Sequence, residues 1–361
     1  MHLDRLKLRD FRNFEALDLQ LEPGFNLIVG KNAQGKTNLL EAIYFIGTGK
    51  RLRGMRDHEA IRQGASSAHI EVTLAEGRTS VSLDIFLSGR KSASINGQSL
   101  PKASDLLGRV PVVAFSASDL PILRGEPSER RAFLDLHLSQ IYPRYLTQFS
   151  AYKQALAQRN SLLKLAQKEP VEASLFVPWE MTMSVSAEHI SLHRERYLAD
   201  LKPEIQARHA QLGSGESITL ELESTLAGLD AAEIADRLAE SRERDIQRGS
   251  TSLGPHRDEW ILCIDQKDAR RYGSQGQQRT AVIALKLAVF RFLEQSLGQS
   301  PVLLLDDIFS DLDHDRRQKL IEIVAQEAGQ VVLTCTDAAQ AGAELGSHAR
   351  RIVIEQGKVS E

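Results

Sequence analysis

The chain has little cysteine, no long apolar run and no strong excess of one charge. Its only two cysteines, Cys263 and Cys335, each stand inside a hydrophobic segment, which is typical of small core residues rather than of a disulfide framework. No apolar stretch is long enough to span a membrane, and residues 1–11 lack the apolar core of a signal peptide. We therefore expect a cytoplasmic protein without a membrane partner.

Beyond this, the composition excludes few classes of protein. The 361 residues are 42% hydrophobic and 26% charged, which suits one large or two ordinary globular domains. A formal net charge of −3 argues against a polycationic nucleic-acid coat, but it permits a local basic surface. No internal repeat stands out, and neither a platform of interleaved aromatic and basic residues nor a DNA-reading helix is evident.

Hydrophobic periodicity divides the chain into a β-rich part and a helical part. Alternation of apolar and polar residues predicts strands through the first 110 residues or so, with a hairpin turn at 95–98 and a buried strand at 110–115. One helix, expected at about 35–46, interrupts these strands. From Gly254 onward, strands and helices alternate. This order favours an α/β fold.

The middle of the chain reads as two long helices around a proline-containing break at 168–178. Its apolar residues follow a heptad-like spacing, which Arg194 interrupts. We expect an antiparallel helical arm at 126–249, inserted into a head formed by 1–125 and 250–361. An ordinary helical subdomain is the alternative.

A phosphate-binding loop is predicted between an apolar strand and the first helix. Gly30 is followed by four residues and then by Gly35-Lys36-Thr37. The glycines allow backbone N–H groups to surround phosphate, Lys36 supplies a mobile charge, and the Thr37 hydroxyl suits Mg²⁺. A surface turn is the alternative. The residues expected to bind the nucleotide here are Gly30, Lys31, Asn32, Ala33, Gln34, Gly35, Lys36, Thr37 and Asn38.

An acidic pair ends a second apolar strand, at Asp306-Asp307. The carboxyl end of a buried strand is where α/β folds bind ligands, so Asp306 is expected to hold Mg²⁺ with Thr37. Asp307 is expected to orient the attacking water, which makes Asp307 and Lys36 the candidate catalytic residues. A solvated turn is the alternative. Together the two motifs predict a nucleoside triphosphatase, and the roughly 270 residues between them indicate an insertion.

The polar segment Ser274-Gln275-Gly276-Gln277 opens an apolar helix about 30 residues before the acidic strand. This arrangement resembles ABC/SMC-type P-loop ATPase heads, in which such a signature motif of one subunit caps the γ-phosphate bound by the other. The segment 310–313, with Asp311, is similar to the D-loop of that family. The resemblance implies a mixed sheet, an antiparallel β subdomain and an inserted α-helical arm. An N-capped helix is the alternative, because serine is a good capping residue.

Further segments resemble one member family, the RecF recombination mediators: 6–14, 123–135, 251–260, the acidic pair at 306–307 and the sequence around the signature. The similarity extends over essentially the whole chain. It implies binding of ATP and Mg²⁺, ATP-dependent dimerisation and slow hydrolysis. It also implies binding to DNA, as duplex or single-strand/double-strand junctions, and partnership with RecR and RecO in loading RecA at gaps. In the wider family, residues equivalent to Arg12 and Asn13 touch the nucleotide.

The chain departs from the ABC pattern at three points. No glutamine stands between Ser116 and Asp119, no histidine stands between Thr334 and Asp337, and Asp307 replaces the usual glutamate. A carboxylate withdrawn by about 1 Å from its water can cost on the order of 100-fold in rate. We therefore hypothesise a weak, DNA-dependent ATPase that uses ATP as a switch for assembly rather than as fuel for a motor.

Local clusters of basic residues are the candidate DNA contacts, since cations neutralise backbone phosphates. Solvated helix faces are the alternative. The candidate DNA contacts are Lys50, Arg51, Arg53, Arg56, Arg130 and Arg131.

Two other functions are alternatives. A transporter ATPase subunit is disfavoured by the long insertion and by the absent glutamine and histidine. An ATPase-gated nuclease is disfavoured because such chains generally carry an added acidic metal-binding domain, which we do not expect here.

Overall fold

The computed structural model describes residues 2–52, 56–75, 79–86, 88–116, 119–213, 215–337 and 349–360. The chain forms two compact units. The first comprises Met1–Asp119, Ala210–Ser214 and Ile283–Glu361, and the second comprises Leu120–His209 and Gly215–Val282. The segment expected to be the arm, 126–249, therefore falls in the second unit except for Ala210–Ser214, and residues 120–125 and 250–282, which were expected in the head or at its border, belong to the second unit as well.

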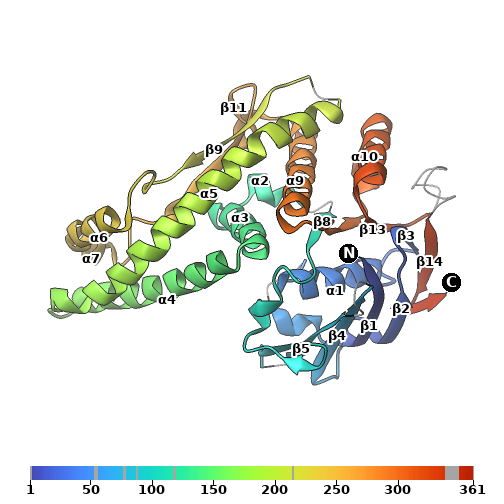
Figure 1. Ribbon diagram of the computed structural model, residues 1–361, viewed down its shortest axis with the longest axis horizontal. Helices are drawn as coiled ribbons and strands as arrows, with labels where there is room; N and C mark the ends of the chain where they lie inside the picture. Colours follow the sequence, from blue (N-terminus) through green and yellow to red (C-terminus); the bar gives the residue numbers. More distant parts are fainter. Residues whose placement is uncertain are drawn as a thin grey trace. The chain divides into compact units, whose positions relative to one another are not determined.

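Two six-stranded sheets form the first unit (Figure 1). One is antiparallel throughout, in the order β2-β1-β4-β5-β6-β7. Its strands are β1 (Leu3–Phe11), β2 (Phe14–Gln20), β4 (Ser67–Leu74), β5 (Thr79–Phe86), β6 (Lys91–Ile95) and β7 (Gln98–Ser99).

The other sheet is mixed, in the order β15-β14-β3-β13-β12-β8, and only its β14–β15 pair is antiparallel. The parallel pairing brings the carboxyl ends of β3, β12 and β13 to one edge, where ligands of α/β folds bind. Its strands are β3 (Gly24–Val29), β8 (Val112–Ser116), β12 (Val302–Asp306), β13 (Gln330–Cys335), β14 (Arg350–Glu355) and β15 (Lys358–Ser360).

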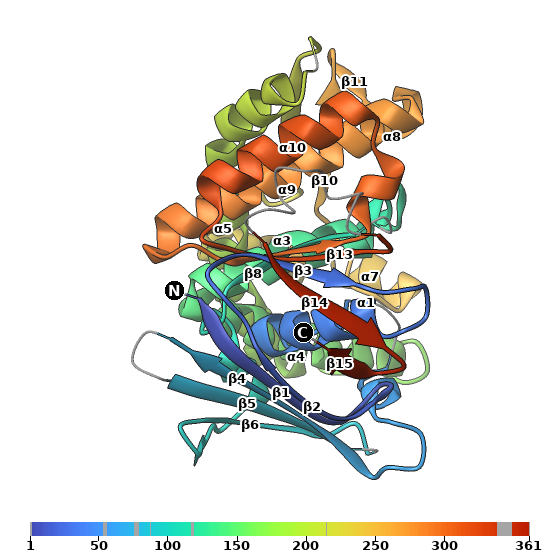
Figure 2. The same ribbon diagram turned by 90° about the vertical axis from the view of Figure 1, so that its right-hand side faces the viewer.

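Helix α1 (Lys36–Thr48) contacts strands of both sheets and shares one apolar core with them. In β4 alternate residues are buried, as expected of a strand with one face on a core. Strands β8, β12 and β13 are buried along their whole length. Figure 2 shows α1 between the two sheets, and the first unit also contains α10 (His314–Glu327) and most of α9 (Gln275–Leu297).

Local sequence signals predicted several of these elements correctly. The turn between β6 and β7 is Asn96-Gly97, and both residues have positive φ (51° and 76°), as a two-residue hairpin turn requires. The helix expected at 35–46 runs over Lys36–Thr48 and ends at Gly49, which takes a left-handed conformation (φ 64°). The strand expected at 110–115 is β8, two residues further along at its start.

Helices dominate the second unit, with a small antiparallel sheet in the order β11-β10-β9. The two longest, α4 and α5, run antiparallel, because Tyr145 of α4 bonds Arg194 of α5 and Arg159 of α4 bonds Glu180 of α5. The elements are α2 (Pro121–Arg124), α3 (Pro127–Ile141), α4 (Pro143–Ala166), α5 (Val177–Gln211), β9 (Ile218–Glu223), α6 (Ala231–Glu240), α7 (Arg242–Arg248), β10 (Glu259–Ile264), β11 (Lys267–Asp268) and α8 (Ala269–Tyr272).

A buried ion-pair network explains why Arg194 interrupts the heptad-like spacing. Its side chain is 1% exposed and contacts Asp135 at 2.7 Å and Asp258 at 2.8 Å. The Tyr145 hydroxyl donates to the same Asp135 carboxylate at 2.6 Å. A buried charge must be paired to be tolerated, so removing any one member should strongly destabilise the second unit. Segments 123–135 and 251–260, which carried much of the family resemblance, thus contribute to this network.

His256 gives the second unit a pH dependence. Burial lowers the pKa of His256 to about 4, and its ring accepts from the Tyr152 hydroxyl and donates to the Thr251 carbonyl. The folded state therefore binds fewer protons than the unfolded state between pH 4 and 6.5, so its stability falls as the pH falls through this window. We expect the wild type to lose about 2 kcal/mol more stability than His256→Gln between pH 7 and pH 5. Chemical denaturation at both pH values measures this difference, and equal losses would contradict it.

Two absences hold within the described ranges. None of their helices is both long enough and apolar enough to cross a bilayer. Cys263 and Cys335 are both buried and unpaired, in agreement with their interpretation as core residues.

Candidate nucleotide site

The phosphate loop connects β3 to α1. Its two glycines, Gly30 and Gly35, exclude a side chain for different structural reasons. A Cβ at Gly30 would lie 2.4 Å from the carbonyl oxygen of Ile354 in β14. Gly35 has a φ of 114°, and a Cβ there would lie 2.5 Å from Nδ2 of Asn13. Ala33 between them is also left-handed, with a φ of 64°. Larger residues at either glycine would deform the loop.

The Lys36 side chain forms hydrogen bonds with the backbone of the loop to which it belongs. Its ammonium group donates to the carbonyl oxygens of Gly30 at 2.5 Å and Lys31 at 2.9 Å. Because an ammonium group has three donors, one remains for a phosphate oxygen. Burial lowers the pKa of Lys36, and the negative charge of Asp307 opposes this shift.

Thr37 and Asp306 meet across the sheet edge. The Thr37 hydroxyl donates to Oδ1 of Asp306 at 2.8 Å, and the Thr334 hydroxyl contacts the same oxygen at 3.0 Å. Asp306 is only 1% exposed. The next residue, Asp307, is left-handed (φ 51°), and its N–H donates to Thr334 Oγ1 at 3.1 Å. Hydroxyl and carboxylate oxygens at this separation are the donor set that Mg²⁺ prefers.

The β1–β2 turn lies against the loop, although its two candidate residues differ in their contacts. Asn13 donates from Nδ2 to the Gln34 carbonyl at 3.0 Å and accepts from the Asn38 side chain at 2.8 Å. Arg12 instead forms a bidentate pair with Glu41 of α1, at 2.8 and 3.0 Å. Asn13 therefore helps to shape the phosphate loop, and Arg12 is held beside α1 by a buried carboxylate.

The signature segment belongs to the second unit, whereas the phosphate loop belongs to the first. Ser274 Oγ accepts from the N–H of Gln277 at 3.2 Å, and Gln277 Oε1 accepts from the N–H of Ser274 at 2.6 Å. This reciprocal pair is a capping box. The Gln277 side chain also donates to Glu216 at 2.6 Å. Ser274, Gln275 and Gly276 are exposed, and the N–H groups of Gln275 and Gly276 lie in the first helical turn, where an anion is favoured.

The sequence did not predict the contacts of the segment after β8, where ABC ATPases carry the glutamine. Asp119, just after β8, accepts from the N–H of Ser116 at 2.6 Å and forms an ion pair of 2.5 Å with Lys286 of α9. The Lys286 side chain is 7% exposed. No local pattern marks such a pair, because its two members are distant in sequence. The side chain of Asp311, the D-loop candidate, lies outside the described residues.

Two of the candidate DNA contacts are buried in ion pairs, contrary to expectation. The Arg51 side chain is 3% exposed and contacts Glu41 at 3.1 Å and Glu59 at 2.7 Å. The Arg130 side chain is also 3% exposed and contacts Glu259 at 2.6 Å. Both guanidinium groups have internal carboxylate partners and little exposed surface, so in this conformation they do not face DNA phosphates.

The other candidate DNA contacts have different environments. Lys50 and Arg56 are exposed. Arg131 is half-buried and donates to the Asp258 carbonyl at 3.0 Å. Arg53 lies outside the described residues. Of the five described candidates, Lys50 and Arg56 are the ones in an exposed position.

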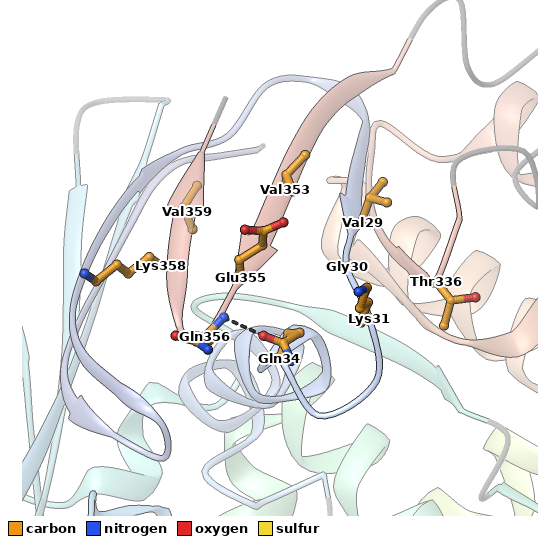
Figure 3. Close-up of a pocket in the computed structure, with 10 residues that line it drawn as sticks. All are labelled: Val29, Gly30, Lys31, Gln34, Thr336, Val353, Glu355, Gln356, Lys358 and Val359. Carbon is orange, nitrogen blue, oxygen red and sulfur yellow. Dashed lines mark hydrogen bonds between the residues drawn. The ribbon is translucent and has the colours of Figure 1, made fainter.

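A pocket of about 750 Å³ adjoins the outer side of the phosphate loop (Figure 3). One wall comes from the end of β3 and the loop, and the other from the β14–β15 hairpin. Its lining combines apolar strand residues with amide and charged groups: Val29, Gly30, Lys31, Gln34, Thr336, Val353, Glu355, Gln356, Lys358 and Val359.

Comparison with known proteins gives matches over the full chain. The family model described as RecF/RecN/SMC N terminal domain matches residues 2–360. The DNA replication and repair protein RecF of Agathobacter rectalis is 38% identical over 339 residues, which cover 93% of this chain and 92% of that protein. The protein of the same name from Halalkalibacterium halodurans is 36% identical over 371 residues, with 100% of both chains covered.

Solved structures of proteins with the same or a related name also match this chain. A structure of the recombination mediator protein RecF-ATP in the RecFOR pathway has a TM-score of 0.90 and 30% identity, covering 99% of this chain and 97% of that chain. An SmcHead bound to the C-winged helix domain of ScpA has a TM-score of 0.57 at 16% identity, covering 100% of this chain and 96% of that chain, which bears on the fold alone. The predicted fold class, an ABC/SMC-type ATPase head with mixed and antiparallel sheets, is confirmed.

Proposed function

This chain belongs to the RecF family, and on that premise we propose that it is an ATP-binding recombination mediator of DNA repair. The observation that carries the proposal is the 2.8 Å hydrogen bond from Thr37 to Asp306. It joins the two motifs of a nucleotide site from positions 269 residues apart. We propose the bacterial cytoplasm, where DNA is repaired, as its compartment.

ATP with Mg²⁺ is the proposed ligand. The third donor of Lys36 would contact phosphate, and the oxygens of Thr37 and Asp306 would hold the metal. The bound ion would supply positive charge for the phosphate oxygens. Asp307 would orient the attacking water, and its left-handed backbone, fixed by the bond to Thr334, would set the direction of its carboxylate.

The proposed active form is an ATP-dependent homodimer. The signature of one copy, Ser274 to Gln277, would cap the γ-phosphate held by the loop of the other copy, with Asp311 nearby. The exposed residues Gln275 and Gly276 in the first turn of α9 support this role, since the N–H groups of a helix N-terminus attract anions. The capping box supports the alternative that Ser274 serves only its own helix.

DNA is the proposed partner of the ATP-bound dimer, as duplex or as a single-strand/double-strand junction. RecR and RecO would act with the dimer, and RecA would be loaded at gaps as a result. Among the described candidates near the phosphate-loop helix, Lys50 and Arg56 are exposed, and we propose that they contact phosphate.

DNA affinity should depend on nucleotide. We expect the wild type to bind junction DNA at least about tenfold more tightly with ATP and Mg²⁺ than without nucleotide, and this binding should weaken steeply with salt. Fluorescence anisotropy with labelled junction DNA measures both effects. Lys36→Ala is the control, because it should bind equally with and without ATP. Equal affinity of the wild type in both states would count against the proposal.

ATP hydrolysis should be slow, as suits a switch. We expect turnover below about one per second, faster with DNA than without it, and strongly reduced in Asp307→Asn. A phosphate-release assay measures the turnover with and without DNA. Turnover on the order of tens per second without any effect of DNA would show a motor-like enzyme instead.

A further inference from the structure

The phosphate loop is held in an unfavourable backbone shape. Within six residues it contains two left-handed positions, Ala33 and Gly35, with φ of 64° and 114°. The side chains of Lys31, Asn32 and Ala33 are exposed. Such conformations persist only when surrounding contacts impose them, and a loop that is already ordered saves the cost of ordering it when ligand binds. Contacts from outside the loop fix this shape.

Those contacts converge on Gln34. Its backbone carbonyl accepts from Asn13 Nδ2 at 3.0 Å and from the N–H of Gly357 at 3.2 Å. Its side-chain Oε1 accepts from the N–H of Gln356 at 2.6 Å. Figure 3 shows Gln34 beside the Gln356 turn, at the bottom of the pocket. Two of these three bonds thus come from the turn between β14 and β15, more than 300 residues further along the chain.

The β14–β15 turn is shaped for this close approach. Gln356 and Gly357 both have positive φ, 48° and 74°, and a Cβ at Gly357 would lie 2.8 Å from the Asn13 carbonyl oxygen. The same hairpin meets the start of the loop, where the Ile354 carbonyl leaves no room for a side chain at Gly30. The hairpin therefore touches the loop at its first residue and near its end.

We infer that the β14–β15 hairpin is a positioning element of the nucleotide site, acting through Gln34. The inference rests on the proposed function in one respect, that the loop binds ATP. The hairpin fixes the loop in its binding shape without contacting phosphate itself. Because coupling between two sites is reciprocal, bound nucleotide must in turn hold the hairpin more firmly on the loop.

The first test compares two turn glycines. Gly357→Val should push the hairpin away from Asn13 and raise the Kd for ATP about tenfold. Gly97→Val is the matched control, since Gly97 has a similar φ of 76° in the β6–β7 turn but has no atom within 4 Å of an added Cβ. It should bear the same backbone strain and leave the Kd unchanged. Calorimetric titration with ATP and Mg²⁺, alongside thermal unfolding, separates the loss of affinity from the loss of stability.

The second test uses the wild type and a milder variant. Hydrogen exchange of the Gln356 and Gly357 amides should slow when ATP is added, and Gln34→Met, which lacks the side-chain acceptor, should speed exchange at Gln356. If Gly357→Val does not fold, the exchange rates of the wild type with ATP and of Gln34→Met decide whether the hairpin positions the loop. A wild type that binds no ATP overturns the proposed function itself. A wild type that binds ATP while its turn amides exchange at an unchanged rate, or a Gly357→Val protein of normal affinity, overturns the role of the hairpin.

Discussion

Lys36→Ala is expected to weaken ATP binding about 100-fold, because it removes a buried positive charge and both internal bonds of the loop. The Lys36 ammonium group holds the carbonyls of Gly30 and Lys31 while its remaining donor would meet phosphate. Alanine would thus remove the ligand contact and loosen the loop at once. Titration of ATP in the presence of Mg²⁺ measures the effect.

The control for this prediction is Lys164→Ala, which removes an exposed lysine of α4 in the second unit and should leave ATP affinity unchanged. The thermal stability of both variants should be recorded with the affinities. A Lys36→Ala protein that binds ATP as tightly as the wild type would show that the loop does not hold the phosphates.

Ser274→Arg is expected to abolish the ATP-dependent dimer while each monomer still binds ATP. The variant places a bulky charged side chain at the start of α9, where the other copy's nucleotide is proposed to dock. The phosphate loop belongs to the other compact unit, so its affinity for ATP should remain within about twofold of the wild type. Sedimentation velocity with ATP and with ADP distinguishes dimer from monomer.

Ser274→Ala separates this role from simple capping. It removes the oxygen that accepts from Gln277, which should cost about 1 kcal/mol of stability, but it adds no bulk. If Ser274 serves only its own helix, both variants should lose stability and both should still dimerise with ATP. If the signature meets the second copy, the arginine variant alone should lose the dimer completely.

The sequence predicted the parts of the site that depend on local pattern. A glycine-rich loop between strand and helix fixes the positions of Gly30 to Thr37, and an apolar strand fixes Asp306 at its carboxyl end. Parallel strands bring such ends to one edge, and the structure joins Thr37 to Asp306 there. The role of Thr334 was not predicted, because a threonine after an apolar strand carries no distinctive signal.

The remaining contacts depend on tertiary pairing between separate elements, which local pattern does not encode. Arg51 and Arg130 stand in basic clusters, yet each has a carboxylate partner elsewhere in the chain, Glu41 and Glu259 respectively. Burial of a charge is permitted only by such partners, and the sequence around the arginine does not reveal them. In the same way, nothing near Gln34 indicates that its side chain meets a turn 322 residues away.

The central claim is that each nucleotide site is shared between two copies, and mixing two defective variants tests it most directly. In a mixed dimer, the intact Lys36 of the Ser274→Arg chain faces the intact Ser274 of the Lys36→Ala chain, so one site is complete. We predict that an equimolar mixture with ATP forms dimers in sedimentation velocity, although neither variant does so alone. A mixture that stays monomeric, like each variant by itself, would contradict the shared site.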